Sequence, residues 1–318
     1  MGFWDRFSED YRRNCLAWRH ASRNPVIPAE GDTWKACWTA NPDVLMLGGR
    51  RLLYYRGNGY LPDSDGQRHD RLAVAELVSV GSHCFCCHDL AGGQPIVDVG
   101  PPGSFDGRDV LDPAAVEFGG EVFLYYSAIG DGPDRIGLAR SADGERFEKV
   151  GPVIVGRAPE VVLHDGCIHL LYQLTDDQGR YEMHLARSAD GLSFEPVSSE
   201  PVFSRASAPA WDSYDVATGR VYAEDGWYYL IYGGNAALVD QPDYFGLARS
   251  RDLVNWERHP GNPIFGCGPK GSEDGGAIWF PALIDAEDCY VLLYEGSRGN
   301  YQFDLSSQIC LATLSKGG

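Results

Sequence analysis

Val122-Phe-Leu-Tyr-Tyr126, followed a turn later by Leu138-Ala-Arg-Ser141, is one of five copies of the same pair of segments in this chain. Aromatic and β-branched residues of this kind favour strands, and the copies recur about every 60 residues, which suits four strands and their loops. The pattern therefore predicts an all-β fold, a five-bladed β-propeller. The other aromatic segments are 51–55, 168–172, 228–232 and 290–294, followed by segments that begin at Leu72, Leu185, Leu247 and Leu311.

The repeat occupies nearly all of the 318 residues, so we expect a single catalytic domain, 1–318, closed as one ring of blades. Residues 1–23 form an extension before the first blade. In it, Phe3, Trp4, Phe7 and Trp18 recur at helical spacing, which predicts a short amphipathic helix over 3–20 that lies against the propeller. The predicted blades cover 24–99, 100–154, 155–203, 204–265 and 266–318.

The charge of the chain limits the classes of partner. Asp and Glu number 45 against 27 Lys and Arg, a formal net charge of −18. Binding to nucleic acid or to an anionic membrane needs a basic surface, so neither partner is expected. A neutral carbohydrate is compatible with this charge. No apolar run is long enough to span a membrane, and the charged residues within 1–10 do not suit a signal peptide.

The nine cysteines are odd in number and scattered along the chain, which favours reduced thiols and a cytoplasmic location. His83-Cys-Phe-Cys-Cys-His88 is dense in potential metal ligands, but it lacks the paired spacing of a zinc site. We expect small buried thiols there and no bound metal. No Gly-rich loop precedes a helix, so no nucleotide or other cofactor is expected.

A second repeat lies between strands. Asp143, Asp190 and Asp252 each follow a Ser two residues earlier, in segments that lead to Phe147, Phe194 and Trp256. Asp in this setting is typical of a tight turn. We therefore interpret these acids as turn residues and expect the aromatic residues to pack between blades.

The candidate active site comes from the residues that begin the innermost strands. These strands start at Asn41-Pro42, Asp112-Pro113, Ala158-Pro159, Thr218-Gly219 and Phe280-Pro281, and proline is tolerated at a strand's first positions. Because side chains alternate along a strand, the first and third residues of each start should share a face. If that face is the channel, three carboxylates from three blades converge: Asp43, Asp112 and Glu160, beside Asn41.

A few residues upstream, Asp106, Asp212 and Asp274 occupy equivalent places, with Lys35 in blade one. A recurring acid is more typical of local structure, such as capping of a loop, than of catalysis. Asp109, Asp215 and Glu273 are further candidates. Trp34 and Trp211 lie near the same mouth, where they would either stack on a sugar or pack between blades.

Several carboxylates between aromatic walls suit the cleavage of a glycosidic bond. One carboxylic acid protonates the leaving oxygen, and a second carboxylate activates water or attacks carbon. A third charge nearby raises the pKa of the acid and keeps it protonated.

At these residues the chain resembles the five-bladed propeller glycosidases, which include glycoside hydrolase families 43, 32, 117 and 130. In family 43 the equivalents of Asn41, Asp112 and Arg157 are a general base, a pKa modulator and a general acid, so two of the three differ here. Family 130 is similar at Asn41-Pro42, Tyr55-Arg56, Asp112-Pro113 and Pro159-Glu160, and this resemblance implies that Asp112 is the general acid. The Arg that usually follows is Ala114.

The sequence therefore predicts a glycosidase, with inversion of configuration implied by the resemblance. A family 130-like phosphorylase and a non-catalytic carbohydrate-binding propeller are the alternatives. The predicted catalytic residues are Asp112, Glu160 and Asp43. The predicted substrate-binding residues are Asn41, Arg56, Trp34, Asp106, Arg157, Trp211, Asp212 and Asp274.

Overall fold

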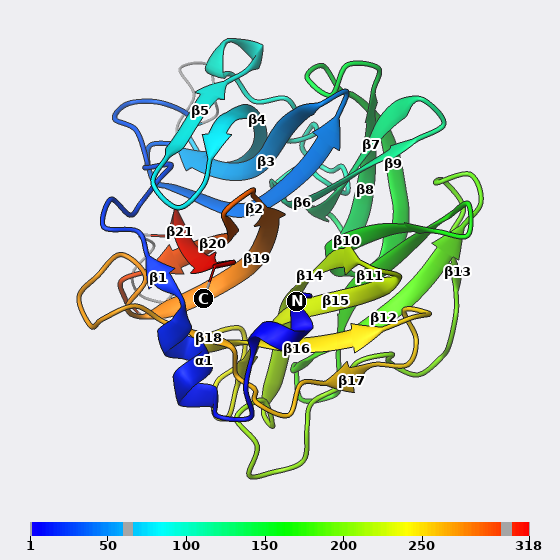
Figure 1. The fold of residues 1–318 in the computed structure, drawn as a ribbon. Helices are drawn as coiled ribbons and strands as arrows, with labels where there is room; N and C mark the ends of the chain where they lie inside the picture. Colours follow the sequence, from blue (N-terminus) through cyan, green and yellow to red (C-terminus); the bar gives the residue numbers. More distant parts are fainter. Residues whose placement is uncertain (1, 60–65, 300–306, 318) are drawn as a thin grey trace. The chain divides into compact units, whose positions relative to one another are not determined.

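The computed structural model of the chain describes residues 2–59, 66–299 and 307–317. Its strands form five antiparallel sheets, each a blade, and in the first four blades the paired strands follow the chain order (Figure 1). The fold is the predicted five-bladed β-propeller. Blade one contains β2 (Trp38–Leu47), β3 (Arg50–Gly59), β4 (His69–Val80) and β5 (Phe85–Asp89), and blade two contains β6 (Asp109–Phe118), β7 (Glu121–Ile129), β8 (Arg135–Ser141) and β9 (Glu148–Val155).

The remaining blades follow the same plan. Blade three contains β10 (Arg157–His164), β11 (Cys167–Thr175), β12 (Tyr181–Ser188) and β13 (Glu195–Pro196). Blade four contains β14 (Asp215–Glu224), β15 (Trp227–Asn235), β16 (Tyr244–Ser250) and β17 (Glu257–Arg258), and β18 (Phe265–Gly266) also pairs with β16. Blade five contains β19 (Ala277–Asp285), β20 (Cys289–Ser297), β21 (Gln308–Ser315) and β1 (Arg19–His20).

The chain separates into two compact units. The first comprises residues 1–26, 173–185 and 198–318, and it holds blades four and five. The second comprises residues 27–172 and 186–197, and it holds blades one and two. The boundary passes through blade three. Within the described residues, the helices are too short to cross a membrane.

The predicted short N-terminal helix is present, but it covers only part of the predicted residues 3–20. The segment forms a 3₁₀ turn, η1 (Trp4–Arg6), and a short helix, α1 (Tyr11–Ala17), before β1 adds the fourth strand to blade five (Figure 1). The helix starts late because the Asp10 carboxylate caps it at the N–H of Arg12. The expected packing is confirmed: Phe3, Trp4 and other aromatic residues of the extension are buried against blades four and five. A second 3₁₀ turn, η2 (Ala91–Gly93), follows β5.

The Ser-x-Asp segments are turns, as predicted. Asp143 accepts hydrogen bonds from the N–H groups of Glu145 and Arg146, and these bonds lower the pKa of its carboxyl. The equivalent bonds at Asp190 lower its pKa to about 2. In the second unit, Phe147 packs edge-on against Tyr54 of the preceding blade, which confirms the predicted packing between blades. Backbone carbonyls of the same turns accept hydrogen bonds from Tyr hydroxyls. Tyr54 donates to the carbonyl of Gly144, and Tyr125 donates to that of Gly191.

A buried acid–tyrosine–cation group joins the loop before the innermost strand to the outermost strand of a blade. In blade two, Asp106 accepts from the Tyr126 hydroxyl at 3.3 Å and from Lys149 Nζ at 2.7 Å. In blade one the charges are exchanged, because Lys35 replaces the acid and Asp89 on β5 replaces the cation, with Tyr55 between them. The groups in blades four and five are Asp212–Tyr232–Arg258 and Asp274–Tyr294–His20.

The Asp274–Tyr294–His20 group of blade five makes a pH-dependent contribution to stability. Burial raises the pKa of Asp274, but hydrogen bonds from His20 and Tyr294 outweigh it and lower the pKa to about 2. The folded state therefore binds this proton less readily than the unfolded chain does. The resulting stabilisation is complete above the ordinary Asp pKa of about 4, and it is lost as the pH falls towards about 2.

Asp274→Asn should lower the free energy of unfolding by about 1–3 kcal/mol at neutral pH, because buried donors lose their ionised acceptor. The difference from the wild type should shrink as the pH falls from 5 to about 3. Urea denaturation at several pH values measures it. The exposed Asp225→Asn is the control, and a mutational effect independent of pH would contradict the assignment.

Candidate functional site

The predicted strand starts at Asn41, Asp112, Thr218 and Phe280 are wrong, because these strands begin earlier, at Trp38, Asp109, Asp215 and Ala277. The aligned positions lie instead at β-bulges inside the strands, where in blades one, two and five the extra residue accommodates a proline. In blades one, two, four and five the strand register shifts by an extra residue between 40 and 43, 111 and 114, 217 and 220, and 279 and 282. The first bulge residue has positive φ in every blade: 50° at Asn41, 54° at Asp112, 46° at Ala158, 51° at Thr218 and 50° at Phe280. This common backbone conformation confirms that the five aligned positions are equivalent.

The bulge overturns one sequence-based prediction. Simple alternation predicted that Asn41 and Asp43 share a face of the sheet. In the structure Asn41 and Pro42 together oppose the single residue Tyr55 of β3, so that the alternation is interrupted before Asp43. Asp43 pairs across the strands with Tyr54, and its carboxylate accepts the N–H of Ala115 in blade two at 2.8 Å. Asp43 therefore ties blade one to blade two. Its catalytic role is still a prediction.

Asp112 sits on the bulge of β6 and differs from the other buried acids. The residue is only 4% exposed, yet within the described ranges its carboxylate makes no hydrogen bond or ion pair. Buried carboxylates are normally paired or hydrogen-bonded, because burial of a charge is costly. An unpaired carboxylate at this position is therefore better explained by ligand binding or by a chemical reaction than by a contribution to the stability of the fold.

Glu160 and Asn41 lie on the strands on either side of β6. β2 and β10 both lie against β6 in the second unit. Glu160 is 7% exposed and Asn41 is 1% exposed. Arg157, the first residue of β10, is half-buried, and its Nε lies 3.5 Å from Asp134. The three adjacent strands thus carry Asn41, Asp112 and Glu160 at or beside their bulges.

A cluster of buried polar residues lies on blade one, beside the bulge at Asn41 and next to blade two. Its members are Trp38, Arg56, Asn58 and Asp70. Trp38, Asn58 and Asp70 oppose one another on β2, β3 and β4. Trp38 Nε1 donates to Asp70 Oδ1 at 3.0 Å, and Arg56 Nε lies 3.4 Å from the same oxygen. The backbone N–H of Asp70 donates to Asp109 at the start of β6.

Sequence reasoning missed Asn58 and Asp70. Burial raises the pKa of Asp70, while Arg56 opposes this rise and Asp109 adds to it. The available signal was a polar run at a strand end: Arg56 and Asn58 alternate on β3, and Asp70 follows in the partner strand. Only the register between β3 and β4 brings them together.

The predicted aromatic and upstream acidic residues are occupied in packing. Trp34 is 2% exposed, stacks on Tyr55 and donates its Nε1 to the carbonyl of Gly93. Trp211 stacks on Tyr232 in the same way in blade four. The carboxylates of Asp106, Asp212 and Asp274 bind Tyr and cationic side chains, in place of the loop N–H groups that capping would use. This geometry favours the structural interpretation for all five residues.

The further acidic candidates of the first unit are also bonded. Asp215 is 2% exposed and accepts the N–H groups of Tyr181 and Asp240. Glu273 pairs with Arg298. Asp215 therefore serves to hold backbone in place, and neither carboxylate has the unpaired character of Asp112.

The Cys- and His-rich run shows no metal site. Among the described residues, no group of three or more His, Cys, Asp and Glu side chains is arranged to hold a metal ion. All nine cysteines are free thiols. The expected burial is wrong for Cys84 and Cys86, which are exposed, because they lie next to and on β5, the outermost strand of blade one. Burial raises the pKa of Cys87 to about 11.

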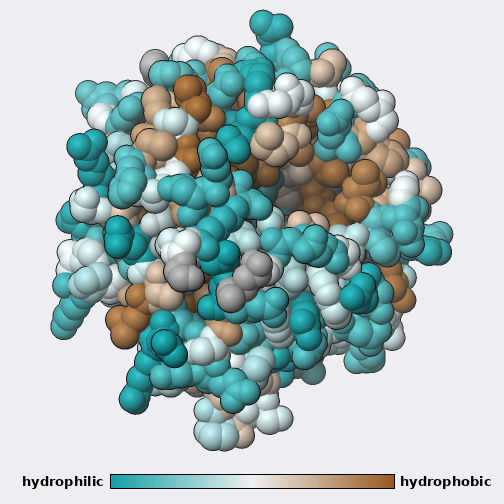
Figure 2. Space-filling model, viewed as in Figure 1, coloured by the Kyte–Doolittle hydropathy of each residue, from teal (hydrophilic) through white to brown (hydrophobic). Residues whose placement is uncertain are grey.

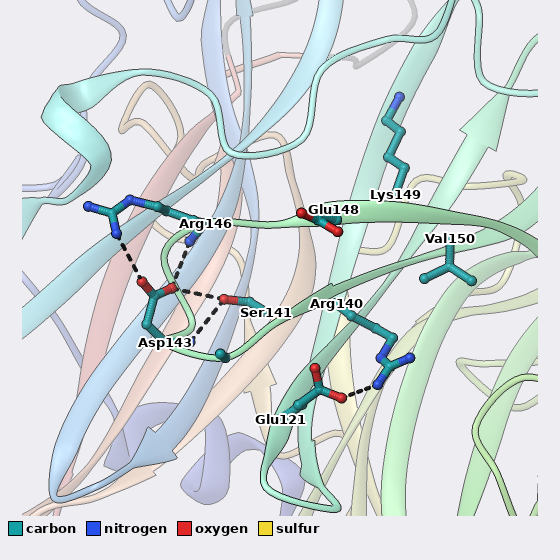
Figure 3. A pocket seen from close by; sticks show the side chains of 9 residues that line it. Glu121, Arg140, Ser141, Asp143, Arg146, Glu148, Lys149 and Val150 are labelled. Atoms are coloured by element: carbon teal, nitrogen blue, oxygen red, sulfur yellow. Dashed lines mark hydrogen bonds and ion pairs between the residues drawn. The ribbon is translucent and has the colours of Figure 1, made fainter.

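Blade two also carries a pocket of about 440 Å³ that is lined by its outer strands. Figure 3 shows Arg140 turned towards Glu121, and Asp143 bonded to Ser141 and Arg146. On the face drawn in Figure 2, apolar side chains gather over blade two while polar ones cover most of the rest. None of the predicted site residues lines this pocket.

The chain matches no protein-family model and no curated protein. Solved structures match it closely in fold. A glycosyl hydrolase from Bacteroides ovatus is 16% identical and aligns over 95% of this chain and 94% of the other, with a TM-score of 0.72. The β-1,2-mannobiose phosphorylase from Listeria innocua is 14% identical over 94% and 96% of the two chains, with a TM-score of 0.70.

A third structure comes from work on the GH130 mannoside phosphorylases, a family described as containing hydrolases that target β-1,2 mannosidic linkages in Candida mannan. It is 16% identical, with a TM-score of 0.69 over 95% of this chain and 94% of the other. These likenesses confirm the resemblance to the five-bladed propeller glycosidases at the level of the fold. They do not select one family among them.

The positive φ of Ala158 predicts opposite effects of the same substitution at two alanines. Ala158→Gly should raise the free energy of unfolding by about 0.5–1 kcal/mol, because relief of left-handed strain exceeds the entropy cost of glycine. Ala114→Gly, at an ordinary buried position of β6, should lower it by about 0.5–1 kcal/mol or more. Denaturant titration measures both free energies, and destabilisation by both variants would contradict the strained, positive-φ conformation at Ala158.

Proposed function

We propose that the protein is a glycoside hydrolase that cleaves a glycosidic bond with carboxylates at the bulges of its innermost strands. The observation that carries the proposal is Asp112, a carboxylate that is almost buried and has no partner within the described ranges. The propeller fold that this chain shares with carbohydrate-active enzymes supports the same conclusion. Because fold alone does not determine function, the proposal rests first on the site.

In the proposed reaction, Asp112 is the general acid and protonates the oxygen of the leaving sugar. Glu160 on the adjacent strand β10 is the general base that activates water, which gives inversion of configuration. Asn41, Arg56 and Arg157 bind the hydroxyl groups of the sugar from the same strand ends.

A phosphorylase is the second candidate, because Asn41-Pro42 and Asp112-Pro113 resemble family 130 and one structural neighbour is a phosphorylase. Phosphorolysis needs a cationic site near the acid. The cations beside these bulges lie close to carboxylates: Arg56 to Asp70, Arg108 to Asp109 and Arg157 to Asp134. This charge balance supports hydrolysis. The cytoplasmic location stays a prediction.

Asp112→Asn should lower turnover by at least about 10²-fold, the low end for loss of a general acid or base, while the protein stays folded. Asp131→Asn, an exposed change in the same blade, is the matched control and should leave turnover unchanged. Release of the aryl group from a panel of aryl pyranosides and furanosides measures the effect. Turnover of Asp112→Asn near that of the wild type would remove Asp112 from the mechanism.

The same panel, run with and without inorganic phosphate, separates the candidate functions. Release that needs no phosphate and is lost in Asp112→Asn establishes a hydrolase and identifies the sugar. Release only with phosphate establishes a phosphorylase. Sugar binding without release, measured by calorimetry and unaffected by Asp112→Asn, would instead establish a carbohydrate-binding propeller.

A further inference from the structure

In the polar cluster on blade one, the Asp70 carboxylate lies next to Arg56, an arginine of the proposed substrate site. Arg56 and Asp70 are both almost buried, 5% and 8% exposed, and they lie on neighbouring rows of one sheet face. Arg56 pairs across the strands with Ala40, the residue directly before the bulge at Asn41. Arg56 therefore lies on β3 beside the bulge where we place the substrate, with its guanidinium over the Trp38 ring.

Three contacts fix the Asp70 carboxylate and its backbone. Trp38 Nε1 donates to Oδ1 at 3.0 Å, and the Asn58 side chain also hydrogen-bonds the carboxylate. From blade two, Asp109 accepts the Asp70 N–H at 3.0 Å. Asp109 begins β6, the strand that carries Asp112. The position of Asp70, and with it that of Arg56, is thus tied to the strand of the proposed acid.

Stability alone does not explain this pair. Burying two charges costs more than an apolar pair of similar volume, and the Nε–Oδ1 distance of 3.4 Å is not that of an optimal ion pair. Its placement beside the bulge suggests a role in recognition. An arginine next to a carboxylate keeps its N–H donors while its positive charge is balanced.

We propose that Asp70 is a specificity-determining and positioning residue: it balances the charge of Arg56 so that the site selects neutral sugars and rejects phosphate and other anionic groups. The choice of sugar rests on the proposed function. The rejection of anions is a property of the binding site itself, so it is measurable without turnover.

Asp70→Asn removes the balancing charge but keeps the shape of the side chain. The variant should bind inorganic phosphate at least about tenfold more tightly than the wild type. The reason is that Asp70→Asn removes a negative charge that repels an anion bound to the Arg56 guanidinium. Isothermal titration with phosphate, and thermal shift in its presence, measure this gain. Arg56→Met/Asp70→Asn should lose the gain.

Asp98→Asn is the matched control, since Asp98 pairs with Arg71 at 2.6 Å in the same blade, outside the proposed cluster. It should not gain phosphate binding. If Asp70→Asn does not fold, Asp109→Asn replaces it, with a smaller gain of the same sign that again depends on Arg56. A purely structural role for Asp70 predicts loss of stability without a gain in anion binding.

Two results would overturn the proposal: phosphate binding by the wild type as tight as that of the variant, or no gain in either carboxylate variant. Failure of the proposed function looks different, because it is silence of the wild type on every glycoside. The titration and the glycoside panel are therefore independent tests of the two claims.

Discussion

The positive φ near the start of each innermost strand, which lies at a β-bulge in blades one, two, four and five, is the constraint on which the candidate site depends. Asn41, Asp112 and Ala158 are not glycine, yet each adopts positive φ, a conformation that costs roughly 1–3 kcal/mol for such residues. Strain that recurs at one place in all five blades must be held by the surrounding sheet. The extra residue turns the strand locally, so that side chains at the bulge leave the ordinary alternation of the strand. The carboxylate of Asp112 is buried there without being taken up in packing.

The rest of each blade holds that strand in place. Hydrogen bonds from bulge and strand backbones cross to neighbouring blades: Ala115 to Asp43 and Ala158 to Ser127 in the second unit, and Phe280 to Thr218 in the first. The acid–tyrosine–cation groups anchor the loop before the strand to the outermost strand. Acids that recur in this way are occupied by structure, and this contrast makes Asp112 informative.

The sequence was sufficient for the fold because the repeat is strong. Aromatic strands, Ser-x-Asp turns and prolines after the strand starts fix the number of blades and nearly all of their limits. The exceptions are local: β1 joins blade five from the far end of the chain, and the extension forms a 3₁₀ turn and a short helix instead of one helix. A helical spacing over so few turns is decided by tertiary packing and capping.

The site was less predictable, because it depends on strand register. The prolines at 42, 113 and 159 lie inside the strands that they were expected to begin. Nothing in the composition shows that the residue before each proline takes positive φ. Alternation therefore placed Asp43 on the wrong face. Asp70 was missed for a similar reason, since it reaches Arg56 only through the pairing of β3 with β4. Trp34 and Trp211 suited either packing or sugar binding by type, and their burial in the blades favours packing.

The central claim is that Asp112 gives a proton to the leaving sugar. The most direct test compares wild type and Asp112→Asn on two glycosides of the same sugar, one with a poor leaving group and one, such as a dinitrophenyl glycoside, that leaves without protonation. A general acid predicts a large loss of kcat/KM on the poor leaving group and a much smaller loss on the activated one. An equal loss on both would show that Asp112 does not act as the acid.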